Sequence, residues 1–362
     1  MPLPVYDPAH YPDQLAAKAA AFEARFAPLG VADVAVHASA PLHYRMRAEF
    51  RIWHDGDALD YAMFDPENPR QPIKLDTFPP AAEAICALMP LLRDKLRGSE
   101  ALRRSLFQLD FLATVSGEML VTLIYHRRLN EDWEAAARAL GDELGIRLIG
   151  RSKGQKIVLD RDWLLEELEL NGRRLRYQQT ENSFTQPNAG VNRQMLAWAC
   201  AQAAGFGGNL VELYCGNGNF TFALAPLFKQ VLATEVSKSS VSAARFGLET
   251  NGIDNVALVR MSSEEFSAAL AGRESFQRLK DIDLEPFRHA TLFVDPPRSG
   301  LDATTLELAR GFDRILYISC NQETLFENAT ALQETHRIAA AAVFDQFPYT
   351  HHLECGLVLV RR

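Results

Sequence analysis

The sequence predicts an α/β protein in which a Rossmann-like domain with a parallel sheet follows an α+β domain. Three observations support this prediction. The 362 residues exceed the length at which one hydrophobic core usually stops growing, which favours two domains. Short apolar runs alternate with helical patterns from residue 209 onwards, as they do in parallel sheets. Residues 292–294 and 315–318 are buried-strand patterns that end abruptly in polar, reactive residues.

The N-terminal half begins with an amphipathic helix over residues 11–26, because Leu15, Ala19, Phe22 and Phe26 recur at helical spacing. Alternating apolar and polar residues predict strands at 44–53, 59–63, 106–114 and 119–125, with hairpin turns at 54–57 and 115–118. Further patterns predict helices at 80–104 and 131–144, and strands at 146–159 and 168–178. Residues 1–180 are therefore expected to form an α+β domain around a small antiparallel sheet.

Basic residues cluster in this predicted domain, and aromatic residues lie between the clusters. The basic clusters are residues 43–47 with Arg51, 126–128, 151–156 and 173–176, and the aromatic residues are Phe50, Trp53, Phe107 and Tyr125. Lys and Arg bind phosphates, and aromatic rings stack on unpaired bases, so the combination suits single-stranded or looped RNA. The ordinary alternative is a set of solvated, charged strand faces.

A polar, turn-rich segment at residues 180–192 precedes a helical run at residues 193–204, and we place the domain boundary there. Residues 181–362 then form the second domain. Gln186 lies in the polar segment, where residues 186–188 taken alone predict a plain turn.

The second domain opens with a buried strand at residues 210–214 and a loop in which Gly216 and Gly218 allow a ligand to approach the backbone closely. A dinucleotide fingerprint would need a third glycine where Thr221 stands, and no Walker lysine follows, which argues against NAD and ATP. The next strand ends in Glu235, where such folds place the acid that binds a ribose diol. S-adenosylmethionine also presents a ribose, although glycine turns between strand and helix are common.

The two strand patterns at residues 292–294 and 315–318 end in Asp-Pro-Pro-Arg (295–298) and Ser-Cys-Asn (319–321). Ligands in open α/β sheets bind beyond the carboxyl ends of the strands, so Asp295, Arg298 and Cys320 are expected to face one crevice. The position of Cys320 after a strand favours a nucleophile. The alternative is a small apolar residue that ends a core strand.

The last strand patterns, at residues 338–344 and 356–360, predict an antiparallel pair joined by a loop that carries Glu354. On sequence alone, an exposed hairpin acid is the ordinary interpretation of this residue. His351 and His352 lack a third ligand at suitable spacing, so no metal site is expected.

Composition narrows the function classes. The five cysteines are scattered and include no CxxC pair, so neither disulfides, structural zinc nor an iron–sulfur cluster is expected. A net charge of −8 argues against nonspecific coating of nucleic acid and requires any RNA-binding surface to be local. No apolar run approaches membrane-spanning length, and the first residues lack a signal-peptide pattern. We expect a cytoplasmic protein without a membrane segment or an obligate protein partner.

Four segments in this order, CGNGNF, DPPRSGL, ILYISCN and HHLECG, resemble the RNA uracil-5-methyltransferases. The resemblance covers essentially the whole chain. DPPR together with SCN is a specific signal for this family, whereas the two glycines of the CGNGNF loop are not. Further segments similar to the bacterial tRNA enzymes of this family are FRIWHDG, YHRRL, IGRSKGQK and SFTQPN. Ribosomal-RNA enzymes of the family generally add an N-terminal barrel domain and often cluster-binding cysteines, and neither is evident.

The resemblance implies a Rossmann-like, S-adenosylmethionine-dependent methyltransferase domain preceded by an RNA-binding domain, and an activity that methylates C5 of the T-loop uridine of tRNA. The S-adenosylmethionine contacts that it implies are Gln186, Tyr214, Asn219, Glu235 and Asp295. It implies Cys320 as the nucleophile that forms a covalent adduct at C6, and Glu354 as the general base of the elimination. The matched RNA contacts are Arg298, Arg51, Phe107 and His126.

Two alternatives remain beside this hypothesis. One is a uridine methyltransferase that acts on ribosomal RNA. The other is an RNA-binding or RNA-folding protein that keeps the fold without the chemistry, although the presence of both Cys320 and Glu354 favours an enzyme. An amine methyltransferase is disfavoured, because DPPR with a strand-end cysteine suits methylation of carbon.

Overall fold

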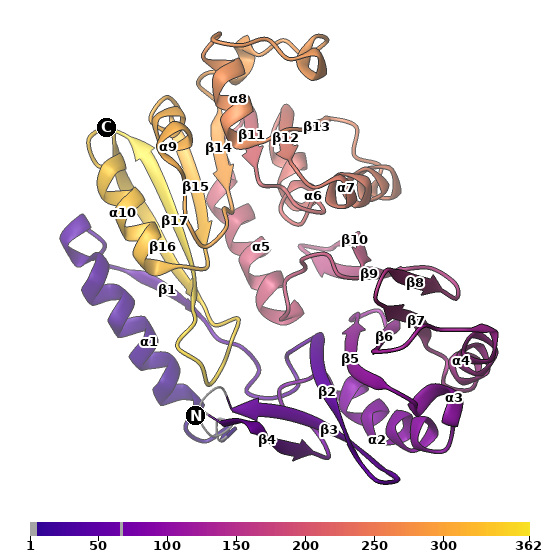
Figure 1. The fold of residues 1–362 in the computed structure, drawn as a ribbon. Coiled ribbons are helices and arrows are strands. Elements are labelled where there is room, and N and C mark those ends of the chain that lie inside the picture. Colours follow the sequence, from indigo (N-terminus) through magenta and orange to yellow (C-terminus); the bar gives the residue numbers. More distant parts are fainter. Residues whose placement is uncertain (1–5, 66–67) are drawn as a thin grey trace.

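The computed structural model describes residues 6–65 and 68–362. Its larger sheet has eight strands and lies in the upper half of Figure 1. In spatial order these strands are β1 (Val34–His37), β16 (His336–Phe344), β17 (Glu354–Arg361), β15 (Arg314–Ser319), β14 (Thr291–Val294), β11 (Asn209–Leu213), β12 (Gln230–Glu235) and β13 (Val256–Arg260). The strands from β15 to β13 run parallel, whereas β17 is antiparallel to both β15 and β16.

The order of the parallel strands creates the place for a site. From β11 the chain moves outwards to β12 and β13, and it then returns to β14 on the other side of β11. Loops that leave β11 and β14 therefore diverge to opposite sides, which opens a crevice at the carboxyl ends of the strands.

Helices and short 3₁₀ turns connect these strands. The helices are α5 (Ala189–Ala203), α6 (Thr221–Leu224), α7 (Lys238–Asn251), α8 (Ser263–Leu270), α9 (Ala303–Ala309) and α10 (Gln322–Leu332). The 3₁₀ turns of this part are η2 (Ala225–Leu227), η3 (Gln277–Leu279) and η4 (Glu285–Phe287). The side chain of Ser237 accepts a hydrogen bond from the Ser240 N–H and caps α7, which ends at a left-handed Gly252.

The sheet is covered on both faces. One apolar core joins it to α1 (Tyr11–Phe26), α8, α9 and α10. A second core joins the opposite face to α5, α6 and a separate hairpin made of β9 (Trp163–Leu170) and β10 (Arg173–Thr180). The hairpin turns at Asn171 and Gly172, which both have positive φ values of 51° and 76°, as a tight two-residue turn requires.

A seven-stranded sheet forms the second body, in the lower right of Figure 1. Its spatial order is β4 (Asn68–Leu75), β3 (Ala58–Asp65), β2 (Arg47–Asp55), β5 (Leu106–Ala113), β6 (Met119–Tyr125), β7 (Arg147–Ser152) and β8 (Gln155–Val158). All neighbours are antiparallel except β6 and β7. The helices α2 (Glu83–Arg97), α3 (Glu100–Arg103) and α4 (Glu131–Leu144) follow in the same body, and α2 and α4 contribute to its core.

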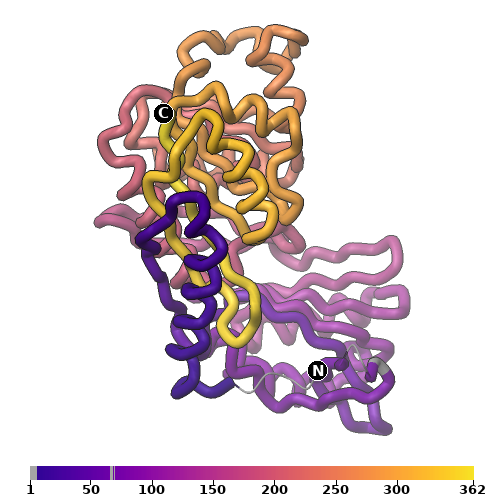
Figure 2. Tube along the Cα trace, turned by 90° about the vertical axis from the view of Figure 1, so that its left-hand side faces the viewer, coloured from indigo at the N-terminus to yellow at the C-terminus, as the bar shows by residue number. Residues whose placement is uncertain are grey.

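Residues 11–37 pair and pack with the large sheet and not with this second body, so the structure divides the chain differently from the predicted domain 1–180. Strand β1 extends the large sheet, with Val34 opposite Ala341 of β16. The apolar face of α1 packs into the core of the same sheet, and the Phe26 ring lies 5.5 Å from the Phe326 ring of α10. Figure 2 shows this indigo helix beside the yellow C-terminal segments. A single cut at residue 180 would separate β1 from its partner and expose the apolar face of α1.

Smaller differences concern individual elements. The helix expected over residues 80–104 is divided into α2 and α3 around Gly98 and Ser99. Each of the segments 146–159 and 168–178 contributes to a hairpin, and the pattern analysis did not identify β1 or β4. A short 3₁₀ turn, η1 (Ala27–Leu29), ends the first helix. Among the described residues, no helix is long and apolar enough to cross a membrane.

Candidate active site

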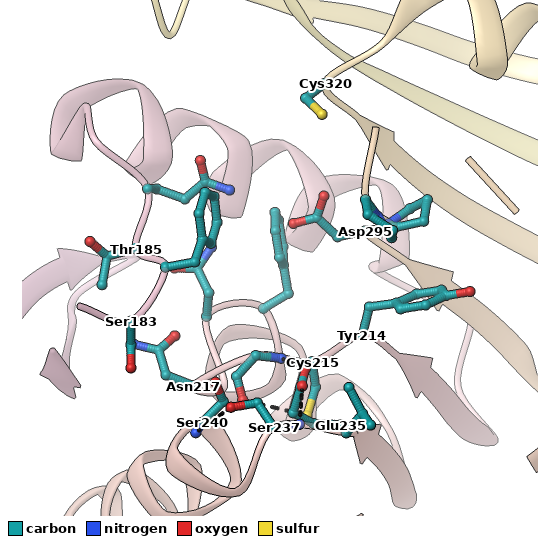
Figure 3. A pocket seen from close by; sticks show the side chains of 18 of the residues that line it. Ser183, Thr185, Tyr214, Cys215, Asn217, Glu235, Ser237, Ser240, Asp295 and Cys320 are labelled. Atoms are coloured by element: carbon teal, nitrogen blue, oxygen red, sulfur yellow. Dashed lines mark hydrogen bonds between the residues drawn. The ribbon is translucent and has the colours of Figure 1, made fainter. Parts of the chain in front are cut away.

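A cavity of about 980 Å³ lies beyond the carboxyl ends of β11, β12, β14 and β15. This volume is in the range of small-molecule sites. Its lining includes all predicted cofactor and catalytic residues, which are Gln186, Tyr214, Asn219, Glu235, Asp295, Cys320 and Glu354. Arg298, a predicted RNA contact, also lines it. Figure 3 shows Cys320 at one end of the cavity with its sulfur directed inwards, Asp295 next to it, and Glu235 at the other end.

Glu235 is the last residue of β12, and backbone groups fix both of its carboxylate oxygens. The N–H of Gly216 donates to Oε2 at 3.0 Å, and the N–H of Ser237 donates to Oε1 at 2.7 Å. A carboxylate has about four acceptor positions, so two of them stay available towards the cavity. The glycine loop and Glu235 thus form one rigid unit, which suits recognition of a ribose diol.

Other polar residues of the cavity are held by specific partners. Asn219 exchanges two hydrogen bonds of 2.9 Å with Asn192 of α5. Tyr214 adopts a left-handed φ of 62°, and its hydroxyl donates to Ser263 Oγ at 2.8 Å. Gln186 accepts a hydrogen bond of 3.1 Å from the buried Gln346. These contacts orient the side chains before any ligand is present.

Asp295 follows β14 directly, and its carboxyl group has an altered acidity. Burial raises the pKa of Asp295 to about 7. A carboxylate in a poorly hydrated position is stabilised by a nearby cation. Asp295 is therefore suited to a positively charged ligand group.

Cys320 follows β15, the neighbour of β14, so the parallel register brings its thiol to the same crevice as Asp295. Burial, together with the charges of Glu354 and Asp295, raises the pKa of the Cys320 thiol to about 11, and Arg298 opposes this increase. Asn321 and Thr324 both donate to the carbonyl of Arg298, at 3.0 and 3.2 Å, so the DPPR and SCN segments are tied together.

Glu354 differs from the ordinary interpretation of its sequence position. It is the first residue of β17, lies opposite Phe344 of β16, and is only 6% exposed. Burial raises the pKa of Glu354 to about 8, with Asp295 adding to the effect and Arg298 opposing it. Glu354 is therefore a buried acid with a raised pKa and not an exposed hairpin acid. It lines the same cavity as the thiol of Cys320.

Pattern analysis missed several residues of the lining. Ser262, Ser263 and Glu264 enter the cavity after β13. Their position beyond the carboxyl end of a parallel strand is a signal that could have identified them. Glu166 and Gln179 come from the β9–β10 hairpin. Residues 182–186 also line the cavity, and among them Phe184 is 74% exposed. No sequence pattern links the hairpin to this site.

Arg51, Phe107 and His126 do not line the cavity, and on the seven-stranded sheet both Arg51 and His126 contact Phe107. The guanidinium carbon of Arg51 lies 3.8 Å from the centre of the Phe107 ring. The His126 ring centre lies 4.0 Å from that of Phe107. We call these three residues the aromatic stack. Within residues 6–65 and 68–362, no group of His, Cys, Asp and Glu has the arrangement of a metal site.

A solved structure with the same fold shows which class of protein this architecture defines. The tRNA (uracil-54, C5)-methyltransferase of Pyrococcus abyssi, in complex with S-adenosyl-L-homocysteine, aligns over 97% of this chain and 83% of its own, with a TM-score of 0.72 and 20% identity. This likeness concerns the fold. The expected class, a Rossmann-like methyltransferase fold with an additional domain, is therefore confirmed.

The sequence comparisons are more specific. The family model described as tRNA (Uracil-5-)-methyltransferase matches residues 10–362. The tRNA/tmRNA (uracil-C(5))-methyltransferase of Dechloromonas aromatica is 80% identical over all 362 residues of both chains. That of Aromatoleum aromaticum is 67% identical over 100% of this chain and 98% of its own. The chain belongs to the tRNA (uracil-5-)-methyltransferase family, and the resemblance seen in the sequence is confirmed.

Proposed function

We propose that this protein transfers the methyl group of S-adenosylmethionine to C5 of a uridine in tRNA, at the T-loop position 54 named for the Pyrococcus relative. The observation that carries the proposal is one cavity whose lining includes Glu235, Asp295, Cys320 and Glu354. Family membership over residues 10–362 and the names of the 80% and 67% identical relatives support the same activity. We place this activity in the cytoplasm.

The residues of the cavity fit S-adenosylmethionine. Glu235 offers acceptor positions for the ribose diol next to the glycine loop. Asn219, Gln186 and Tyr214 offer polar and aromatic contacts, and Asp295 suits the positive charge of a sulfonium. When bound, this co-substrate supplies an electrophilic methyl group.

Cys320 activates the uracil. C5 of uracil is a weak nucleophile, so the Cys320 thiolate adds to C6 and shifts electron density to C5 and the O4 oxygen. The bond between the Cys320 sulfur and C6 forms as the C5–C6 double bond opens. C5 then attacks the methyl group, whose bond to the sulfonium sulfur breaks, so that S-adenosyl-L-homocysteine leaves. Arg298, which lines the cavity, stabilises the developing oxyanion.

Glu354 completes the reaction. After methyl transfer C5 carries both a hydrogen and the methyl group. Glu354 removes the C5 proton, the C5–C6 double bond re-forms, and Cys320 leaves as the thiolate. The pKa of about 8 makes Glu354 a much stronger base than an exposed carboxylate. A base must be ionised at this step, so deprotonation of Glu354 is part of the activation of the site.

The target uridine must leave the base stack to present its C6 face to Cys320. We propose that the second body, with the aromatic stack Arg51, Phe107 and His126, binds the RNA. Arg51 and His126 are exposed, and a planar guanidinium and two rings offer surfaces on which unpaired bases stack.

The test uses two substitutions with different expected intermediates. Glu354→Gln keeps the side-chain shape but cannot accept the C5 proton, so addition and methyl transfer proceed while elimination stalls. A denaturant-resistant protein–RNA adduct that carries a labelled methyl group should accumulate on a denaturing gel. Cys320→Ala should form no adduct and no 5-methyluridine. Normal turnover of Glu354→Gln, or an adduct with Cys320→Ala, would contradict the assigned roles.

A further inference from the structure

A second cavity, of about 650 Å³, lies on the seven-stranded sheet and takes no part in the proposed chemistry. Its lining consists of Tyr125, His126, Arg127, Arg128, Ser152, Lys153, Gly154 and Gln155. We call it the basic cavity. It lies between the end of β6 and the turn that joins β7 to β8, and its lining contains basic but no acidic side chains.

The walls of the basic cavity are fixed by internal contacts. The side chain of Gln155 accepts from the Leu129 N–H at 2.9 Å and donates to the Leu129 carbonyl at 3.1 Å. This pair ties the β7–β8 turn to the loop after β6. The guanidinium of Arg127 donates to the carbonyls of Arg104 at 2.9 Å and Arg128 at 3.1 Å, and also to that of Ala101. Arg127 is therefore a structural residue, and the cavity exists before a ligand binds.

Two cations of the cavity are left for a ligand. Arg128 and Lys153 are exposed, and within the described parts of the chain neither has an ion-pair partner. The neighbouring cations are neutralised instead: Arg151 lies 2.6 Å from Glu181, and Lys156 lies 2.6 Å from Asp162. Of the basic cluster at residues 151–156, only Lys153 offers an unpaired charge.

The strand register places the basic cavity beside the aromatic stack. Arg51 of β2 lies opposite Gln108 of β5, Leu106 of β5 opposite Tyr125 of β6, and Ile124 of β6 opposite Arg151 of β7. Neighbouring strands are about 4.8 Å apart, so the stack and the cavity form one continuous row across the end of the sheet. His126 belongs to both.

This row lies at the end of the sheet opposite to the contact between Arg47 and the lining of the catalytic cavity. Arg47 at the start of β2 donates to the carbonyl of Ser183, which lines the catalytic cavity, and pairs with Leu112 of β5. Leu106 is six residues away from Leu112 along β5, a distance of about 20 Å in a strand. RNA bound in the basic cavity is thus contacted at a distance from the uridine that reacts.

We propose that Arg128 and Lys153 bind a phosphodiester group of the tRNA, next to a base that stacks on the aromatic stack. The inference rests on the proposed tRNA substrate. Two free cations without an acidic neighbour attract a phosphate and repel a metal ion. Rings beside a phosphate site are the combination that binds an unpaired strand.

The experiment compares the double variant Arg128→Ala/Lys153→Ala with the wild-type enzyme and with Lys95→Ala/Arg97→Ala, which removes the same charge from α2. The tRNA Kd is measured by fluorescence anisotropy at several salt concentrations, and methylation is measured in parallel. We expect about tenfold weaker binding by the first variant and a slope of log K against log salt that is smaller by about 0.7, because one single-strand phosphate contact contributes about 0.7. The kcat at saturating tRNA should be unchanged, since the cavity is remote from Cys320.

Wild-type affinity and slope in the first variant would overturn the inference, and so would an equal loss in the Lys95/Arg97 control, because the effect would then reflect net charge alone. Unfolding curves check that both variants fold. Absence of tRNA methylation by the wild-type enzyme would refute the proposed function instead. The two failures can be distinguished because the salt dependence of tRNA binding is measured independently of methylation.

Discussion

The ammonium group of Lys18 lies 2.7 Å from Oδ1 of Asp345, with the two side chains 9% and 0% exposed. The same ammonium donates to the carbonyls of Phe347 and His352, each at 3.1 Å. Lys18 belongs to α1, whereas Asp345 and His352 begin and end the loop that leads into Glu354. One N-terminal side chain thus closes the loop that positions the proposed base.

Loss of the contact between Lys18 and Asp345 should slow the elimination step that Glu354 performs and should leave cofactor affinity unchanged. Lys18→Met alone leaves Asp345 as an unpaired buried charge and should destabilise the protein by about 3–5 kcal/mol. The double variant Lys18→Met/Asp345→Asn removes both charges and should recover much of this stability, but it still lacks the links to Phe347 and His352. We expect it to bind S-adenosyl-L-homocysteine normally and to accumulate the methylated adduct. A normal elimination rate in the folded double variant would disprove a positioning role.

Glu235→Gln should weaken binding of S-adenosyl-L-homocysteine by roughly tenfold to a hundredfold. The amide has one acceptor oxygen in place of two, and its NH₂ group would face a backbone N–H that now donates to the carboxylate. A hydrogen bond to a charged group is worth about 1.5–3 kcal/mol. Calorimetry measures the affinity, with Glu307→Gln at an exposed position of α9 as the control. Equal affinities in the two variants would argue against the ribose role.

Reactivity of Cys320 should respond to the charge of the cofactor. The negative charges of Glu354 and Asp295 help to raise the pKa of this thiol, so a cation next to them lowers it. S-adenosylmethionine should therefore accelerate alkylation of Cys320 by iodoacetamide, whereas the neutral and nearly isosteric S-adenosyl-L-homocysteine should not. Peptide mass spectrometry distinguishes Cys320 from half-buried Cys86, which serves as the internal control. Identical rates with both ligands would exclude this activation.

Glu354 should also make stability depend on pH. Its pKa is about 8 in the folded protein and near the ordinary 4.5 when the chain is unfolded. Between these two pKa values the folded state keeps a proton that the unfolded state releases. The resulting stabilisation is complete below the unfolded-state pKa and is lost as the pH rises through the folded-state pKa.

Urea unfolding at about pH 5 and about pH 9 measures this effect. Glu354→Gln should gain stability relative to the wild type at the higher pH by a few kcal/mol, since a change of one in the pKa is worth about 1.4 kcal/mol. Glu307→Gln should show no such gain. If the wild type and Glu354→Gln lose stability in parallel, the buried acid does not titrate as described.

Local pattern was enough to determine much of this protein. The periodicity of apolar residues fixed α1, α4 and β6 with the bounds found in the structure. Reactive residues at strand ends predicted that Glu235, Asp295 and Cys320 lie at one edge of the sheet, and all three line the same cavity, because parallel strands in an open sheet share one carboxyl edge. Such patterns depend on each segment's own burial and on a general rule of chain topology.

Pairing between distant segments was decided only by the tertiary structure. The apolar face of α1 had to be covered, but nothing in its sequence specified α10 and the large sheet as the partners. The sequence around Glu354 is typical of an exposed loop acid, but the residue is buried because β17 lies between β15 and β16 in the sheet. Similarly, ion pairs with Glu181 and Asp162 neutralise Arg151 and Lys156, two members of a basic cluster that the sequence shows as uniformly positive. Burial and charge balance depend on which surfaces meet, and a segment's own residues do not determine that choice.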